Sequence, residues 1–156
     1  MAPILHRGGR ACIPGRVESP DKPYVLEDQV GFVLRRANQR HLAIFAEAIP
    51  GLTTTQFTVL VRLHQLGPLS QNHLGRVTAM DGATIKGVVD RLARQGLVAT
   101  APDPGDRRRL TVSLTEAGAA AFAATRDTAL EVSRRTLAPL TPAEQARFLE
   151  LLNKLA

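Results

Sequence analysis

The 156-residue sequence predicts a mainly helical fold with one small β-hairpin. From residue 25 onward, apolar residues recur at the three- and four-residue spacing that is typical of amphipathic helices. Capping residues and glycine or proline pairs divide this pattern into six helices. The segment 97–114 is different, because an alternating run at 110–114 follows a Pro-Gly-Asp turn signal there, which indicates a hairpin.

The first 24 residues form a separate unit. They are rich in glycine, proline and arginine, and such a composition buries little apolar surface. An unstructured leader is one interpretation, and a basic arm that touches DNA or a partner subunit is the other. The only cysteine, Cys12, lies here, which excludes an intramolecular disulfide and favours a reducing cytosol.

The first helix is expected from Leu26 to about Ile49, where Pro50 and Gly51 end it. A Thr-Thr-Thr-Gln run at 53–56 then fits a capping box. Leu52 and Phe57 have the spacing of a hydrophobic staple. One face of the first helix carries Val30, Leu34, Ala37, His41, Ile44, Phe45 and Ala48. The second helix is expected to bury Phe57, Leu60, Val61 and His64.

A helix-turn-helix is predicted next. Ser70 caps a short third helix, and a fourth helix runs from about Asp81 to Gln95, with Gly96 just beyond it. The inward positions are Leu74 and Val77, then Ile85, Val88, Val89 and Leu92. Residues 97–101 and 110–114 are expected to form the two strands of the hairpin. We call the two strands and the tip between them the wing.

Two further helices follow the wing. Thr115 is expected to cap an alanine-rich helix that runs to about Thr136, and its small side chains permit close helix packing. A Thr-Pro-Ala-Glu run at 141–144 combines a cap, a first-turn proline and a capping-box glutamate. The last helix carries one apolar stripe, made of Phe148, Leu151, Leu152 and Leu155. One protomer cannot cover both this stripe and the alanine-rich face, which predicts a dimer.

The charge favours a nucleic-acid partner, since the formal net charge is +6. A recognition helix reads the major groove with its first turns. Thr84 can donate to phosphate or contact a thymine methyl, and Lys86 can reach guanine or phosphate. Arg91 and Arg94 lie further along and fit phosphate contacts. A solvated helix face is the alternative interpretation of these side chains.

Three consecutive arginines mark the tip of the wing. Beside a minor groove, such a cluster gains from the negative potential of the groove. Asp106 is expected to orient Arg108, while Arg107 and Arg109 are expected to hold phosphates. Asp90 on the fourth helix could also brace a wing arginine.

The runs DGATIKGVVDRLARQGLV at 81–98 and DRRRLTVSLTEAG at 106–118 resemble those of the MarR family of winged helix-turn-helix regulators. The resemblance implies a winged domain at 53–114 and a helical dimerisation region at 25–52 and 115–156. It implies a homodimer that places two recognition helices in successive major grooves of double-stranded DNA, on a pseudo-palindromic operator. Arg108 is then the residue expected in the minor groove.

Members of this family are commonly released from DNA by small anionic aromatic ligands, so the resemblance implies an effector site. We expect a pocket between the first two helices for an aromatic carboxylate or its coenzyme A thioester. The candidate residues are Arg36, Asn38, Arg40, His41, Phe57 and His64. Core histidines and a solvated basic face are the alternative interpretations of this set.

Other function classes find less support. Cys12 lies outside the first helix, where some family members carry an oxidant-sensing cysteine. His41 and His64 lack an evident third zinc ligand. No phosphate loop, nucleophile elbow or paired carboxylates indicate an enzyme, no cofactor is implied, and no apolar run could span a membrane. The competing hypothesis is a winged-helix architectural or protein-interaction module without sequence-specific readout.

Overall fold

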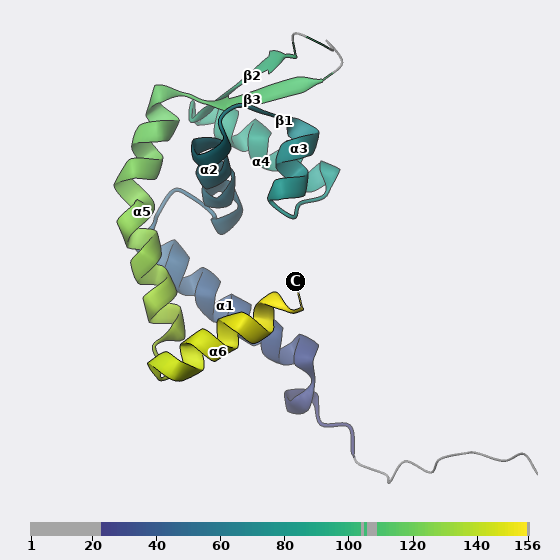
Figure 1. Ribbon diagram of the computed structural model, residues 1–156, viewed down its shortest axis with the longest axis vertical. Coiled ribbons are helices and arrows are strands. Elements are labelled where there is room, and N and C mark those ends of the chain that lie inside the picture. The colour runs from purple at the N-terminus through teal and green to yellow at the C-terminus, as the bar shows by residue number, and fades with distance from the viewer. Residues whose placement is uncertain (1–22, 104, 106–108, 156) are drawn as a thin grey trace, which may run out of the picture.

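The computed structural model describes residues 23–103, 105 and 109–155. A small mixed lobe lies above a purely helical lobe, and one long helix runs beside both (Figure 1). This confirms the predicted fold class. The arm predicted at residues 1–24, with Cys12, falls almost entirely outside the described residues.

The helical lobe is built from four segments. A short 3-10 turn, η1 (Leu26–Asp28), precedes α1 (Val30–Ala48), so the predicted first helix is broken at Gln29, whose backbone is extended. The long helix α5 (Glu116–Leu137) packs along α1, and α6 (Pro142–Asn153) starts near the lower end of α5 and crosses in front of α1 (Figure 1).

The mixed lobe contains the helix-turn-helix and the wing. Its helices are α2 (Thr54–Leu66), α3 (Gln71–Val77) and α4 (Gly82–Arg94). The predicted capping box is confirmed, because Thr53 Oγ1 accepts from Gln56 N and the Gln56 side chain accepts from Thr53 N. Ser70 and Asp81 cap α3 and α4 by accepting from His73 N and Thr84 N.

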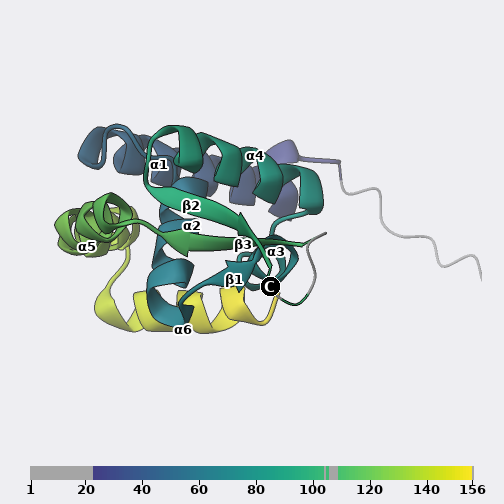
Figure 2. The same ribbon diagram turned by 90° about the horizontal axis from the view of Figure 1, so that it is seen from above.

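The hairpin strands β2 (Val98–Pro102) and β3 (Leu110–Leu114) belong to a three-stranded antiparallel sheet (Figure 2). The third strand, β1 (Leu69–Ser70), pairs with β3 on the side opposite β2. The sequence did not predict β1, because two residues carry no alternation. Since β1 leads directly into α3, the sheet ties the wing to the helix-turn-helix.

The buried face of α2 differs from the prediction by one helical position. Gln56 is buried and His64 is exposed, although the apolar pattern placed His64 inward. Gln56 tolerates burial because its amide is satisfied: it accepts from Thr53 N at 2.8 Å and donates to Gln95 Oε1 at 3.0 Å. A buried polar residue is invisible to a pattern that counts apolar side chains.

Two apolar clusters form the core. The larger one fills the mixed lobe between α2, α3, α4, the sheet and Phe122 of α5. The smaller one lies between α1 and α5 and contains Ile44, Phe45, Ile49 and Val132. Leu52 and Phe57 pack against both clusters. These two side chains therefore join the helical lobe to the mixed lobe.

The last helix is weakly covered. None of the residues of α6, all of which the structure describes, is buried. Its predicted apolar stripe is largely exposed, with Phe148 at 38%, Leu151 at 45% and Leu155 at 74%. No helix in the described part of the chain is long and apolar enough to cross a membrane.

Candidate DNA-binding surface and effector pocket

Helix α4 presents a polar face away from the core. Its apolar side chains Ile85, Val88, Val89 and Leu92 are all buried, as predicted. Thr84 is exposed on the first turn, where Asp81 caps the helix. Asp81 Oδ1 accepts from Thr84 N at 2.7 Å, and Oδ2 accepts from Thr84 Oγ1 at 2.9 Å. Both hydrogen bonds lower the pKa of Asp81 below its ordinary value, and the bond from the Thr84 backbone has the larger effect.

The cations of α4 lie along the same exposed face. Lys86 Nζ pairs with Asp90 Oδ2 at 2.7 Å, so Asp90 has a partner on its own helix. Arg94 Nε donates to the Asp90 carbonyl at 3.3 Å. The guanidinium of Arg91 lies beside Gly87, 3.6 Å from the position of an added Cβ. Because such exposed pairs are weak, Lys86 can exchange Asp90 for a DNA group at little cost.

The wing is described only in part. Asp106, Arg107 and Arg108 lie outside the described residues, so their predicted roles remain predictions. Arg109 is described and exposed.

Sequence reasoning missed the role of Asp103. Its Oδ1 accepts from Gly105 N at 2.8 Å, and its Oδ2 accepts from Thr111 Oγ1 at 3.2 Å. The Asp103 amide also donates to the carbonyl of Arg109 at 2.9 Å, which closes the base of the tip. The aspartate of an Asp-Pro-Gly sequence is a recognised turn signal that could have indicated this role.

The end of the wing is anchored to the ends of two helices. Thr115 Oγ1 accepts from Gly118 N at 3.0 Å and donates to the carbonyl of Gly96 at 2.7 Å. Gly118 lies against the backbone of Leu97, so a Cβ at this position would collide with the Leu97 carbonyl oxygen. Leu114, Thr115 and Gly118, the second half of the run at 106–118, thus have a structural role. They fix the wing to the end of α4 and the start of α5.

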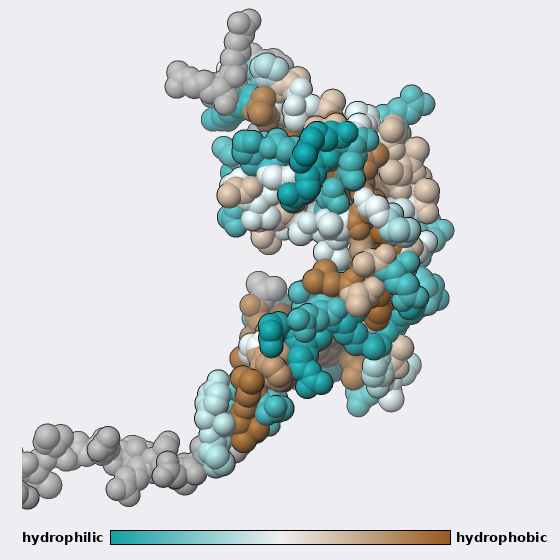
Figure 3. Space-filling model, turned by 180° about the vertical axis from the view of Figure 1, so that it is seen from behind, coloured by the Kyte–Doolittle hydropathy of each residue, from teal (hydrophilic) through white to brown (hydrophobic). Residues whose placement is uncertain are grey.

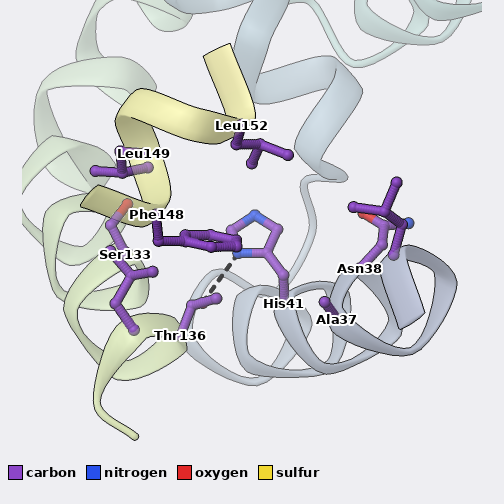
Figure 4. Close-up of a pocket in the computed structure, with 10 residues that line it drawn as sticks. Ala37, Asn38, His41, Ser133, Thr136, Phe148, Leu149 and Leu152 are labelled. Carbon is purple, nitrogen blue, oxygen red and sulfur yellow. Dashed lines mark hydrogen bonds between the residues drawn. The ribbon is translucent and has the colours of Figure 1, made fainter. Parts of the chain in front are cut away.

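A pocket of about 520 Å³ opens between α1, α5 and α6 (Figure 4). We call it the α1–α5–α6 pocket. Its size falls in the range of small-molecule sites. Its lining is mostly apolar, and its described lining residues include no arginine or lysine. They are Leu34, Ala37, Asn38, His41, Ser133, Thr136, Leu137, Phe148, Leu149 and Leu152.

His41 is held at the floor of this pocket. Its Nδ1 lies 3.0 Å from Thr136 Oγ1, while the Thr136 hydroxyl donates to the carbonyl of Val132 at 2.8 Å. A hydroxyl has a single proton, so His41 Nδ1 carries the hydrogen of the first bond. In the neutral ring, Nε2 is then an acceptor. Figure 4 shows this second nitrogen pointing toward Leu152, with the ring of Phe148 alongside.

The structure does not bring the six predicted effector residues together. Asn38 and His41 line the α1–α5–α6 pocket, but Arg36, Arg40, Phe57 and His64 are not among its lining residues. Arg40 instead donates to the Arg135 carbonyl at 3.0 Å, and Arg36 lies over the ring of Phe32. The α1–α5–α6 pocket thus differs from the site predicted between the first two helices, because α5 and α6 supply most of its walls.

His64 and Phe57 take part in a different arrangement. Five rings are in sequential contact from the pocket to the mixed lobe, with successive centroids 6.4, 5.8, 6.1 and 4.4 Å apart. We call this series the aromatic row, and its members are His41, Phe45, Phe57, Phe122 and His64. It runs from α1 through the start of α2 and Phe122 of α5 to His64 in the last turn of α2.

The part of the chain that the structure describes contains no group of three or more His, Cys, Asp or Glu side chains placed to hold a metal ion. His41 and His64 lie at opposite ends of the aromatic row.

Comparisons with known proteins agree with this geometry. Residues 51–109 match the model of the MarR family. The HTH-type transcriptional repressor NicR of Pseudomonas putida is 43% identical over 144 residues, which are 91% of each chain.

Two solved structures are similar over nearly their whole length. A probable transcriptional regulator from Pseudomonas aeruginosa has a TM-score of 0.82 at 53% identity and covers 85% of this chain and 100% of its own. BpsR of Bordetella bronchiseptica, whose DNA binding is regulated by 6-hydroxynicotinic acid, has a TM-score of 0.81 at 41% identity. That match covers 86% of this chain and 97% of BpsR.

Proposed function

The chain belongs to the MarR family of winged-helix transcriptional regulators, and from this premise we propose that it is an effector-controlled repressor. It binds a pseudo-palindromic operator as a homodimer. A small aromatic acid in the α1–α5–α6 pocket releases it from DNA. The observation that carries this proposal is His41, a polar ring anchored in a mostly apolar pocket.

The exposed face of α4 supports DNA binding. Thr84, Lys86, Arg91 and Arg94 are all exposed, while the opposite face of the helix is fixed in the core. A helix held in this way offers its first turns to a major groove and its later arginines to phosphates. The formal charge of +6 adds a favourable sequence-independent attraction.

Exposed apolar side chains on two elements support a homodimer. One group lies on η1 and the first half of α1, and another lies on α6 and just beyond its end: Leu26, Val30, Val33 and Leu34, then Phe148, Leu149, Leu151 and Leu155. Figure 3 shows apolar side chains at the surface of the helical lobe. Exposed apolar side chains gathered on one lobe in this way support an interface there. A second copy covers it with the same elements and places two α4 helices about 34–36 Å apart.

The pocket chemistry supports an aromatic acid as effector. An aromatic ring fits between Phe148 and the aliphatic walls, and His41 Nε2 accepts from a ring hydroxyl or ring N–H of the ligand. Since the described lining residues include no cation, the carboxylate stays at the mouth in contact with water, because burying an unpaired charge is unfavourable. Hydroxylated aromatic acids, 6-hydroxynicotinic acid among them, combine these groups.

A coenzyme A thioester of such an acid is the second candidate effector. Its acyl ring would occupy the same pocket, while its phosphates would remain outside. Arg35 and Arg36 are exposed on α1 beside Phe32 and supply positive charge for these phosphates.

Release of DNA follows from the position of the pocket. Leu34 and Phe148 belong both to its lining and to the surface proposed for the second copy. A ligand that separates α1 from α6 therefore changes the dimer surface and with it the spacing of the two α4 helices. The aromatic row offers a second route by which the ligand can act on the mixed lobe. Phe57, one of its members, packs against both core clusters. In either case the effector must bind the DNA-incompetent form more tightly.

One experiment tests the proposal as a whole. The full-length protein is used to select binding sites from a randomised duplex library. The selected duplex is then titrated in the presence of a panel of hydroxylated aromatic acids and their coenzyme A thioesters. We expect a selected site with two-fold symmetry and at least one compound that weakens binding about tenfold, equivalent to 1.4 kcal/mol. A panel without any effect at millimolar concentration would overturn the effector assignment.

The alternative is a winged-helix module without sequence-specific readout. The same selection distinguishes it, since a specific regulator prefers its site over random DNA by about 10³ or more. A library that shows no enrichment after repeated rounds would favour the module.

A further inference from the structure

The first turn of α4 contains a hydroxyl whose hydrogen-bond polarity is fixed. Thr84 Oγ1 lies 2.9 Å from Asp81 Oδ2, and the backbone nitrogen of Thr84 lies 2.7 Å from Asp81 Oδ1. Both carboxylate oxygens are therefore engaged by the same residue. The lowered pKa of Asp81 keeps its carboxyl ionised, and an ionised carboxylate only accepts hydrogen bonds.

The consequence concerns the single hydroxyl proton of Thr84. Because Asp81 can only accept, this proton points at Asp81 Oδ2, and the lone pairs of Oγ1 face outward. Thr84 is exposed, so these lone pairs are available to a partner in front of the helix. A partner of Thr84 Oγ1 must then donate. This differs from the expectation that Thr84 donates to phosphate.

The major groove offers few such donors. Adenine presents the N6 amino group and cytosine the N4 amino group, whereas guanine O6 and N7, thymine O4 and the phosphate oxygens only accept. The negative charge of Asp81 acts in the same direction, since it attracts amino hydrogens and repels acceptor atoms. The Asp81–Thr84 pair is therefore complementary to one kind of base edge.

On the basis of the proposed function, which places α4 in the major groove, we infer that Thr84 reads the amino group of an adenine or a cytosine through its Oγ1 lone pairs. Asp81 is a positioning residue: it sets the direction of the hydroxyl and touches no base. Lys86 reads or neutralises acceptors nearby once it leaves Asp90. The start of α4 thus offers an acceptor to donor edges through Thr84 and, on another side of the helix, a cation to acceptor groups through Lys86.

The test uses duplexes selected from the randomised library with the full-length dimer. At each position of a half-site, adenine is replaced by purine, which lacks the N6 amino group, or cytosine by 2-pyrimidinone, which lacks the N4 amino group. Wild-type protein is expected to lose about fivefold in affinity at one such position, the net strength of a single hydrogen bond. Thr84→Val keeps the shape of the side chain and should lose this sensitivity, while Thr84→Ser should keep it.

Two further variants test the positioning role and the specificity of the effect. Asp81→Asn can donate to Oγ1, which frees the hydroxyl proton, so sensitivity to the amino group should fall although α4 stays capped. Lys86→Ala should weaken binding yet leave the amino-group sensitivity unchanged. Thermal unfolding of each variant verifies that α4 remains folded.

Two outcomes must be distinguished. If wild-type protein selects no preferred site, the proposed function itself fails. If it selects a site, but wild type and Thr84→Val respond equally to every amino-group deletion, only the reading by Thr84 is overturned. A loss of amino-group sensitivity in Thr84→Ser as well would also overturn it, because the serine retains the hydroxyl.

Discussion

His41 Nδ1 lies 3.0 Å from Thr136 Oγ1, which joins the middle of α1 to the last turn of α5. The Thr136 hydroxyl also donates to the Val132 carbonyl at 2.8 Å, so the imidazole is both oriented and assigned one tautomer. An aromatic side chain fixed in this way presents its second nitrogen to the α1–α5–α6 pocket (Figure 4). Pre-organisation of this kind lowers the conformational entropy that the His41 side chain loses when a ligand binds.

Thr136→Val removes the anchor of His41 without changing the size of the side chain. We expect the affinity for the aromatic acid to fall about fivefold, the worth of one hydrogen bond, because the ring is no longer held in its binding orientation. DNA affinity should not change. Calorimetric titration of the ligand measures the effect.

Thr125→Val is the matched control on the same helix. The Thr125 hydroxyl bonds only within α5, to the carbonyls of Ala121 and Phe122, and Thr125 does not line the pocket. Equal losses of ligand affinity in both variants would mean that the His41–Thr136 bond has no particular role.

Gly118→Ala should destabilise the protein by at least about 2 kcal/mol, since overpacking against fixed backbone is costly. The added Cβ would collide with the Leu97 carbonyl where the wing joins α5. Denaturant unfolding provides the measurement. Gly82→Ala is the control, because no atom lies within 4 Å of its added Cβ, and its stability should stay within about 0.5 kcal/mol of wild type. Similar behaviour of the two variants would contradict the assigned structural role of Gly118.

Leu151→Glu combined with Leu155→Glu should shift the protein toward monomers. Leu151 lies on α6 and Leu155 lies two residues beyond its end, and both side chains are exposed. Charges placed there oppose burial against a second copy. Sedimentation equilibrium reports the association state. Leu66→Glu, at the exposed end of α2, is the control and should remain dimeric. An unchanged dimer in the α6 variant would exclude α6 from the interface.

Arg91→Ala should weaken binding to specific and random duplexes alike and reduce the salt slope by about one counterion, the behaviour of a phosphate contact. Fluorescence anisotropy at several salt concentrations measures both quantities. Arg126→Ala makes the same charge change on α5, far along the chain from α4, and should alter neither the slope nor the affinity markedly. If Arg91→Ala weakens only specific binding, Arg91 reads bases instead.

Local signals in the sequence predicted the elements well. Thr53, Ser70, Thr115 and Thr141 all cap helices as expected, because a cap depends on side chains only three residues apart. Asp81, which was expected to be the first residue of its helix, caps α4 instead. The buried face of α4 was predicted for a similar reason, since its apolar spacing is regular. The hairpin was predicted from its alternation and its turn residues.

The pocket could not be predicted in the same way. Its walls come from residues almost a hundred positions apart in the sequence, such as His41 and Thr136, and only the packing of α5 on α1 brings them together. The pattern did place Asn38 and His41 correctly on one face of the first helix. It assigned His64 to the same site because apolar periodicity is tolerant to a shift of one position, whereas burial of Gln56 turns His64 outward.

The central claim is that occupancy of the α1–α5–α6 pocket controls DNA binding through His41. The most direct measurement is the operator affinity of wild type, His41→Phe and His64→Phe, each with and without a saturating aromatic acid. Phenylalanine keeps an aromatic ring at both positions and removes the nitrogens. We predict that the acid weakens operator binding at least about tenfold in wild type and His64→Phe, and hardly at all in His41→Phe. Equal release of all three proteins would contradict the account.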